Sequence, residues 1–399
     1  MKKPSLFMIP AMILFVVAVM VSCLNDDPDP PHTTIPYELP VIEGFPKNLN
    51  IPEDNPLTEE GVKLGRYLFH DGRLSGRLHP DSLMSCATCH VQEKGFEAGI
   101  DHPKFKGGQP VGIPSEEYPQ GKPTPHFMLP TINLVYNHNG YLWNGSVHET
   151  NEELGSPEYG VPADPAFHRK SVEAFAWMAI VAPHEINGDL EKTVETIESI
   201  PIYPPMFEAA YGSPEVSIEK ISKSIAQYVR TIVSYRSKYH QWLRGEAELT
   251  PAEQRGYDLF FSETADCFHC HSGVLLTTNQ FYNNAKDSVF DGIGDRYSVT
   301  KKPWDLGAFR APSLINCEIT APYMHDGRFK TLEEVVDFYS EGLVSSDYVH
   351  PLMKGVSKGG VRLDPQEKSD LIAFLKTFTD HALLEDPAYS KPSDLHFDR

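Results

Sequence analysis

Two motifs of the form Cys-x-x-Cys-His occur in the 399-residue chain, one spanning 86–90 and the other 267–271. Each places two thiols one helical turn apart with an imidazole directly after them, the pattern that attaches a c-type haem through two thioether bonds. A single Cys-x-x-Cys pair could also belong to a zinc site or a redox dithiol. Two complete copies predict a dihaem cytochrome c, with these attachment residues and proximal iron ligands: Cys86, Cys89, His90, Cys267, Cys270 and His271.

Composition and charge narrow the classes of partner. Of the six cysteines, four lie in the motifs, and the remaining Cys23 and Cys317 are too far apart in sequence and context to suggest a disulfide framework. The formal net charge of -20 argues against nucleic acid and against an anionic membrane surface as binding partners. A basic redox protein fits this charge better.

The N-terminus has the features of a targeting segment. Two lysines precede an apolar stretch at 6–21, and a small serine stands before Cys23. We predict a lipoprotein-type signal at 1–23, an exported chain, and a lipid on Cys23 that anchors it to a membrane, as in a periplasmic or outer-membrane lipoprotein of a bacterium. A plain signal peptide and an uncleaved anchor helix are the alternatives, although the apolar run is short for the ~20 residues that a bilayer requires. Residues 24–45, rich in Asp, Pro and Thr, predict a disordered tether.

Helical patterns open and close each half of the remaining sequence. In the first half they lie at 58–69 and 218–235, where apolar residues recur at helical spacing. In the second half, Thr250 to Glu253 form a capping box with Pro at the first helical position, and 365–378 is amphipathic. Glycines beside aromatic residues in both opening helices indicate a close helix crossing.

This repetition predicts an all-α fold built from two tandem cytochrome c-type haem domains. We place the N-terminal domain at 46–243 and the C-terminal domain at 244–385. The length suits this division, since domains usually hold roughly 100 to 200 residues.

Three further segments carry a resemblance to a known family. They are Leu142-Trp143-Asn144-Gly145, Pro183-His184-Glu185-Ile186-Asn187, and the stretch from Thr320 to Gly327. With the paired motifs, they make the chain resemble the bacterial dihaem cytochrome c peroxidase and MauG family over roughly residues 57–379. The resemblance implies that the haem of the N-terminal domain reacts with peroxide and that the haem of the C-terminal domain supplies or stores electrons.

The resemblance also implies two catalytic residues. Glu185 matches the acid-base Glu of the family, and Trp143 matches a Trp that stands between the two haems. A surface carboxylate and a core Trp are the plain alternatives. Phe175 stands where the family has a Gln, and Ser146 where it usually has an Arg, so we expect a drier pocket with fewer hydrogen-bond donors. The segment 147–170 is an insertion relative to the family, expected either to cover the entrance to the first haem or to be a surface loop.

The sixth ligand of the second haem is expected on the helix that a capping box opens at 331–334. Tyr339 of this helix matches the position of the family's distal ligand, which is Met in typical peroxidases and Tyr in the MauG type. A Tyr oxygen favours oxidised iron, whereas Met raises the reduction potential. A core tyrosine is the alternative, and Met353 is the rival ligand. Met324 and His325 are expected to pack beside the site.

Further ligand candidates come from the same comparison with the family. His102 and His126 are candidates to close the first haem in its resting state. The backbone carbonyls of Thr320 and Pro322 match positions that hold an interdomain calcium in relatives, although the Asn partner of that site is Met128 here.

The combined prediction is a dihaem c-type peroxidase that reduces hydrogen peroxide to water with electrons from a small cytochrome or copper protein. One alternative is a MauG-like oxidase of a protein or organic substrate, favoured by Tyr339 and the missing Gln. The other is a dihaem electron carrier without an open haem, favoured if His102 or His126 is a permanent ligand.

Overall fold

The computed structural model describes residues 32–146 and 171–396, and those from Ile35 onward belong to one compact unit. The predicted signal segment with Cys23 and the predicted insertion at 147–170 lie outside the described residues. In the part that is described, helices dominate and the sheet content is small, as the sequence predicted. No helix among these residues is long and apolar enough to cross a membrane.

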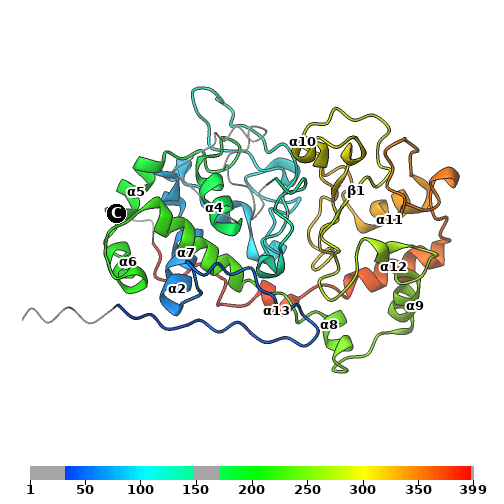
Figure 1. The fold of residues 1–399 in the computed structure, drawn as a ribbon, viewed down its shortest axis with the longest axis horizontal. Helices are drawn as coiled ribbons and strands as arrows, with labels where there is room; N and C mark the ends of the chain where they lie inside the picture. The colour runs from blue at the N-terminus through cyan, green and yellow to red at the C-terminus, as the bar shows by residue number, and fades with distance from the viewer. Residues whose placement is uncertain (1–31, 147–170, 397–399) are drawn as a thin grey trace, which may run out of the picture. The chain divides into compact units, whose positions relative to one another are not determined.

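The helices form two groups along the chain (Figure 1). The N-terminal group holds α2 (Glu59–His70), α3 (Cys86–Cys89), α4 (Ser171–Val181), α5 (Leu190–Glu198), α6 (Tyr203–Tyr211) and α7 (Ile218–Thr231). After α8 (Lys238–Leu243), the C-terminal group holds α9 (Pro251–Phe260), α10 (Arg296–Thr300), α11 (Leu332–Glu341) and α12 (Pro365–Lys376). The short α13 (His381–Leu384) follows and contacts the N-terminal group, where the Gln92 side chain donates to the Leu383 carbonyl at 2.8 Å. Strands β1 (Phe281–Tyr282) and β2 (Phe309–Arg310) pair antiparallel, with Phe281 opposite Arg310.

Helix caps begin three helices where the sequence predicted. The Thr58 side chain accepts a hydrogen bond from the Gly61 amide at the start of α2. Capping boxes open α9, between Thr250 and Glu253, and α11, between Thr331 and Glu334. In a capping box the two side chains satisfy backbone amides that the first helical turn leaves without partners.

Close helix crossings hold each group together, α2 against α7 and α9 against α12 (Figure 1). A Cβ atom added at Gly65 would lie 1.9 Å from the Ser224 carbonyl oxygen, and one added at Gly256 would lie 2.0 Å from the Asp370 carbonyl oxygen. Any side chain at these positions would therefore collide with the facing backbone. The predicted role of glycine in the two crossings is confirmed.

Helix α7 ends at Thr231, four residues before the end of the predicted pattern. The Asp380 carboxylate accepts hydrogen bonds at 3.0 Å from the Ser234 hydroxyl and from the amides of Tyr235 and Arg236. The amides of Tyr235 and Arg236 thus donate to a carboxylate from the far end of the chain instead of to helical carbonyls. The helix therefore ends at Thr231 although the apolar pattern continues to residue 235.

Both ends of the compact unit extend beyond the predicted domain limits. The Tyr37 amide donates to the Leu57 carbonyl at 3.0 Å, and Phe45 is buried against Tyr136. Residues 35–45, expected in the tether, therefore belong to the compact unit. After α13 the chain runs back to the N-terminal group, where Tyr67 donates to the Asp394 carboxylate at 2.6 Å.

Candidate functional site

The first Cys-x-x-Cys-His motif forms a single helical turn, α3. The His90 amide donates to the Cys86 carbonyl at 2.8 Å. His90 Nδ1 lies 2.8 Å from the carbonyl oxygen of Phe96. Nδ1 therefore carries the ring hydrogen, and Nε2 keeps its lone pair. Burial lowers the pKa of His90 to about 4, so the ring is neutral, which is the form that binds iron.

The second motif begins as a 3-10 turn, Cys267–His269, and orients its histidine in the same way. The His271 amide donates to the Cys267 carbonyl at 3.0 Å. His271 Nδ1 lies 3.1 Å from the Pro312 carbonyl oxygen, and burial lowers the pKa of this ring to about 4. Both histidines are thus fixed in the tautomer that leaves Nε2 available to a metal.

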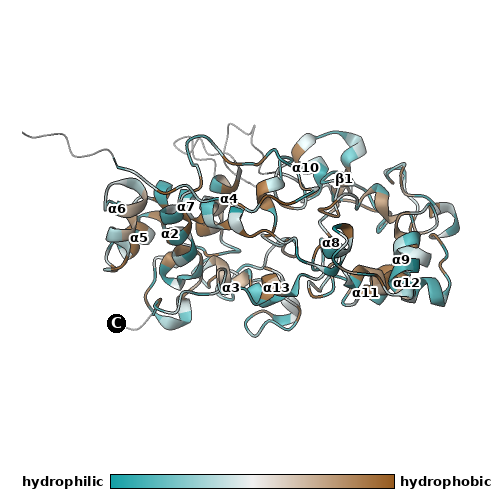
Figure 2. Cartoon of the chain, turned by 90° about the horizontal axis from the view of Figure 1, so that it is seen from below, coloured by the Kyte–Doolittle hydropathy of each residue, from teal (hydrophilic) through white to brown (hydrophobic). Residues whose placement is uncertain are grey.

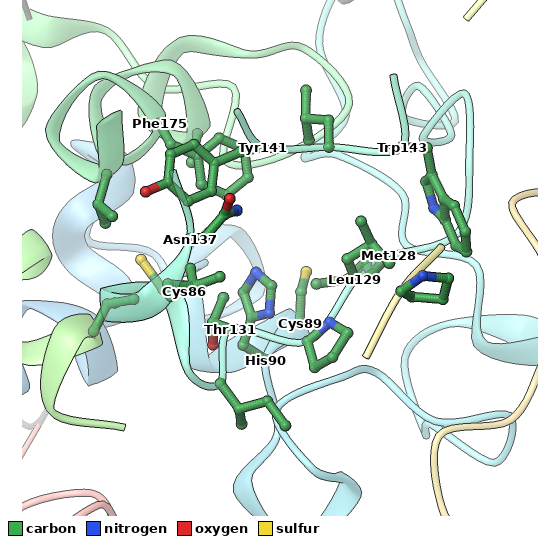
Figure 3. A pocket seen from close by; sticks show the side chains of 18 of the residues that line it. Cys86, Cys89, His90, Met128, Leu129, Thr131, Asn137, Tyr141, Trp143 and Phe175 are labelled. Atoms are coloured by element: carbon green, nitrogen blue, oxygen red, sulfur yellow. The ribbon is translucent and has the colours of Figure 1, made fainter. Parts of the chain in front are cut away.

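A cavity of about 230 Å³, here called the first cavity, opens beside the first motif. In Figure 3 the sulfurs of Cys86 and Cys89 lie on either side of the His90 ring. The buried hydroxyls of Thr124 and Thr131 have no hydrogen-bond partner among the described residues. This set of groups fits a covalently attached haem: the two thiols and the imidazole suit its attachment and its iron, and the two unpaired hydroxyls could donate to its carboxylate side groups. The walls are largely apolar and include Phe69, Met84, Ile132, Tyr141, Val172 and Ala176.

A second cavity, of about 210 Å³, opens beside the second motif. Cys267, Cys270 and His271 all lie in its wall. The C-terminal helices supply most of the apolar residues around it, including Phe260, Leu332, Val336, Leu371 and Leu375. This cavity meets the same requirements for a haem attached through its thiols.

Helix α4 forms one wall of the first cavity and is apolar along most of its length (Figure 2). A buried ion pair anchors its first turn, because Arg230 Nη1 and Nη2 contact the Glu173 carboxylate oxygens at 2.6 and 2.8 Å. Phe175 lies two residues further along and stacks on Tyr141, with ring centroids 6.1 Å apart (Figure 3). This aromatic pair stands where the family that the sequence resembles has a Gln, so the predicted apolar character of this wall is present in the structure.

Glu185 stands in the turn that follows α4. Its amide donates to the Ala182 carbonyl at 2.9 Å, and Arg77 clamps the turn by donating to the Asn187 carbonyl at 2.7 Å. The Glu185 side chain lies in the wall of the first cavity, and burial raises the pKa of its carboxyl to about 7. A carboxyl with such a pKa can both accept and donate a proton near neutral pH.

Trp143 lies in the walls of both cavities. Its ring nitrogen donates to the Phe127 carbonyl at 2.7 Å, which fixes the orientation of the indole. Arg310 of β2 also lies in both walls, and its amide donates to the Trp143 carbonyl at 2.7 Å. Arg310 was not among the predicted site residues, because nothing near it in the sequence forms a motif.

The candidate ligands of the second haem all lie in the second cavity. Tyr339 projects from α11, accepts a hydrogen bond from Asn284 at 3.2 Å, and has its pKa raised to about 12 by burial. Met353 lies in the same wall, so the choice between Tyr339 and Met353 stays a prediction. Met324 and His325 also line this cavity, and His325 stacks on Phe309 with ring centroids 3.6 Å apart.

The other candidates occupy different places. His102 stacks on Phe105 outside the wall of the first cavity, and Ser146 is not in that wall either. His126 does line the first cavity, and its ring Nε2 lies 3.2 Å from the Gly294 carbonyl oxygen. His126 therefore remains available for the predicted role, whereas His102 would have to leave its stacked position.

The expected calcium ligands lie on a loop that includes the cis peptide bond between Ala321 and Pro322. Thr320 approaches Gly95 of the N-terminal group, where a Cβ atom would lie 3.2 Å from the threonine methyl carbon. Met128, which replaces the family's Asn, points its apolar side chain into the first cavity (Figure 3). Calcium at Thr320 and Pro322 stays a prediction.

Comparison with known proteins gives one consistent family. A family profile described as Di-haem cytochrome c peroxidase matches residues 59–248. Cytochrome-c peroxidase IdrP1 of Pseudomonas sp. is 29% identical over 93% of this chain and 92% of its own length. Methylamine utilization protein MauG of Methylorubrum extorquens is 31% identical over 83% of this chain and 82% of its own length.

A solved structure shares the fold at similar identity. The crystal structure of a MauG-like protein associated with microbial copper homeostasis superposes with a TM-score of 0.70 and 32% identity, covering 89% of this chain and 99% of that protein. The predicted resemblance is therefore confirmed over most of the chain.

Proposed function

The chain belongs to the di-haem cytochrome c peroxidase family, and from this membership we propose that it is a dihaem c-type peroxidase that reduces hydrogen peroxide to water. The observation that carries the proposal is the half-buried carboxyl of Glu185, which lines the same apolar cavity as His90 and has its pKa raised to about 7 by desolvation. A pure electron carrier has no need for a titrating carboxyl beside its haem.

The residues of both cavities fit haem: the four motif cysteines would hold it through thioether bonds, and His90 and His271 would ligate its iron. When bound, haem supplies an iron that exchanges electrons and, where one axial position is open, binds peroxide. The protein's own residues then have to hold the substrate, move protons and exclude water. The apolar wall formed by Phe175 and Tyr141 serves the last of these tasks.

Glu185 is proposed to move the protons. Heterolysis of the peroxide bond requires removal of a proton from one oxygen and delivery of a proton to the other. The Glu185 carboxylate accepts the first proton and returns it to the leaving oxygen. The turn held by Arg77 positions the carboxyl for both steps.

Trp143 is proposed to connect the two haems, because its indole lies in the wall of each cavity. The electrons would enter at the second haem from a small cytochrome or copper protein, and the net charge of -20 favours a basic donor. Export with a lipid on Cys23 is part of the same proposal, since covalent haem attachment of this type belongs to exported proteins.

A spectrum of the ferric protein tests the proposal at low cost. We expect one high-spin haem that changes on addition of peroxide and one low-spin haem. Two low-spin haems without any response to peroxide would overturn the peroxidase function and leave an electron carrier, with His126 as the first candidate for the extra ligand.

A MauG-like oxidase of a protein or organic substrate is the second candidate, and Tyr339 favours it. Its hydroxyl lies in the second cavity with an amide donor, Asn284, at 3.2 Å. A bound metal ion lowers the pKa of its ligands, so a tyrosine whose pKa burial raises to about 12 can still ligate as the anion. Such a ligand would give the second haem a low reduction potential.

Tyr339→Phe separates the two candidates. If Tyr339 is the ligand, this variant converts the second haem to a high-spin or differently ligated form while leaving its covalent attachment intact. Met353→Ala is the matched control and should leave the spectrum unchanged. The opposite pattern, with Met353→Ala removing a Met-to-iron charge-transfer band, would return the protein to the typical peroxidase class.

A further inference from the structure

Arg310 is a buried cation without an acidic hydrogen-bond partner. Only 6% of the residue is exposed, and none of its acceptors among the described residues is a carboxylate. Burial lowers the pKa of its guanidinium to about 9, with a further contribution from the nearby Arg296. The group is therefore still charged at neutral pH, and a buried charge without a counter-ion is costly.

Neutral groups surround most of the guanidinium. Nε donates to the Leu142 carbonyl at 3.0 Å, and Nη2 donates to the carbonyls of Asn139 and Gly140 at 2.9 Å each. Nη1 donates one hydrogen to the Asn279 side-chain oxygen. A guanidinium has five N–H donors, so the second hydrogen of Nη1 is left without an acceptor in the described part of the chain.

The position of the side chain indicates where the missing anion belongs. Arg310 lies in the walls of the first and the second cavity. Asn279, whose side-chain oxygen accepts the hydrogen bond from Arg310 Nη1, lies in the wall of the first cavity. Arg296 increases the local positive charge, since both guanidinium groups lie over the Phe281 ring, at 4.1 and 4.8 Å from its centroid. A pair of cavities separated by a buried positive charge suits two ligands that each carry negative groups.

We propose that Arg310 is a counter-ion shared by the two haems, donating through Nη1 to a propionate in the first cavity and neutralising propionate charge in the second. The inference rests on the proposed function only in requiring haem in both cavities. Charge-assisted hydrogen bonds from arginine to a carboxylate are short and strong. One residue then raises both reduction potentials, because positive charge beside a haem favours the reduced iron.

Arg310→Gln tests the proposal by spectroelectrochemical titration of the protein with both haems attached. We expect the potentials of both haems to fall. Arg310→Lys keeps the charge and should leave both potentials close to those of the wild type. Arg296→Gln is the control: Arg296 lies over the same Phe281 ring but lines neither cavity, so its loss should produce clearly smaller shifts in the two potentials.

Several results would overturn the inference. One is Arg310→Gln with both haems in place and unchanged potentials, and another is a shift confined to one haem. If the variant fails to mature, a crystal structure of the haem-loaded wild type decides: a propionate oxygen is expected about 2.7–2.9 Å from Nη1. A guanidinium without a carboxylate contact contradicts the proposal. A protein that shows these shifts but no reaction with peroxide would overturn the proposed function and leave this inference standing.

Discussion

At the scale of single residues, the environment of Glu185 decides whether this cavity performs acid-base chemistry. The first cavity is largely apolar, and Glu185, in the turn after α4, lines it. Glu185→Gln keeps the shape of the side chain but removes the titrating group. We expect both haem spectra to be retained and the reaction with peroxide to slow by about 100-fold or more, the scale of a lost general acid-base.

Stopped-flow mixing with peroxide measures this effect. Glu191→Gln makes the same chemical change on the exposed side of α5 and should leave the rate unchanged. If Glu185→Gln reacts at the wild-type rate, another carboxyl performs the proton transfer.

The pH dependence follows from the direction of the pKa shift. Burial raises the pKa of Glu185 to about 7 from 4.5, so the folded protein binds this proton more tightly than the unfolded chain does. Its contribution to folding stability is therefore full below about pH 4.5 and is lost as the pH rises through about 7. The rate with peroxide should show the reverse trend, because only the carboxylate accepts a proton. We expect the rate to rise with an apparent pKa near 7, and this step to disappear in Glu185→Gln.

The sequence predicted the residues with chemical motifs but not those that act through backbone geometry. The two Cys-x-x-Cys-His motifs identify His90 and His271, yet the carbonyls of Phe96 and Pro312 that fix their tautomers carry no side-chain signal. Arg310 was missed because no motif surrounds it, and the backbone carbonyls that make up most of its acceptors leave no signal in the sequence.

At the scale of elements, the crossings at Gly65 and Gly256 set the positions of the helices around each cavity. Gly65→Ala should destabilise the protein by about 1–3 kcal/mol, the range for overpacking, because the new methyl group would lie 1.9 Å from the Ser224 carbonyl oxygen. This outweighs the gain of roughly 0.5–1 kcal/mol that alanine normally brings to a helix interior.

Denaturant unfolding of the wild type and the variant measures this difference. Lys63→Ala, at an exposed position of the same helix, serves as the control and should change stability by no more than about 0.5 kcal/mol. A Gly65→Ala protein as stable as the wild type would show that α2 and α7 can separate at little cost.

Helix starts were more predictable than helix ends. Caps are local, so Thr250 and Thr331 identify the first turns of α9 and α11 directly. The end of α7 depends instead on Asp380, a carboxylate far away in the sequence, which no local pattern reveals. Helix α4 was missed because its apolar residues are spread around the helix and form no stripe of the kind that marks an amphipathic helix.

At the scale of the whole compact unit, the two cavities have different attachment residues but share part of their walls. Trp143 and Arg310 belong to both walls, and one continuous hydrophobic core includes Leu64 of the N-terminal group and Phe374 of the C-terminal group. The return of the last residues to α2 joins the groups again at the surface. Electronic properties of the two haems are therefore expected to be linked even though the attachment residues are not shared.

This arrangement predicts the outcome of removing one haem at a time. Cys86 lies only in the wall of the first cavity and Cys267 only in that of the second. Cys86→Ala and Cys267→Ala should each remove one covalent haem and leave the other, which haem staining would report as half the wild-type intensity. Cys317→Ala, a buried cysteine of the second cavity outside the motif, should retain full intensity. If either motif variant loses both haems while the protein stays folded, the two haems do not mature independently, and the wall that both cavities share at Trp143 and Arg310 would be the place to look for that dependence.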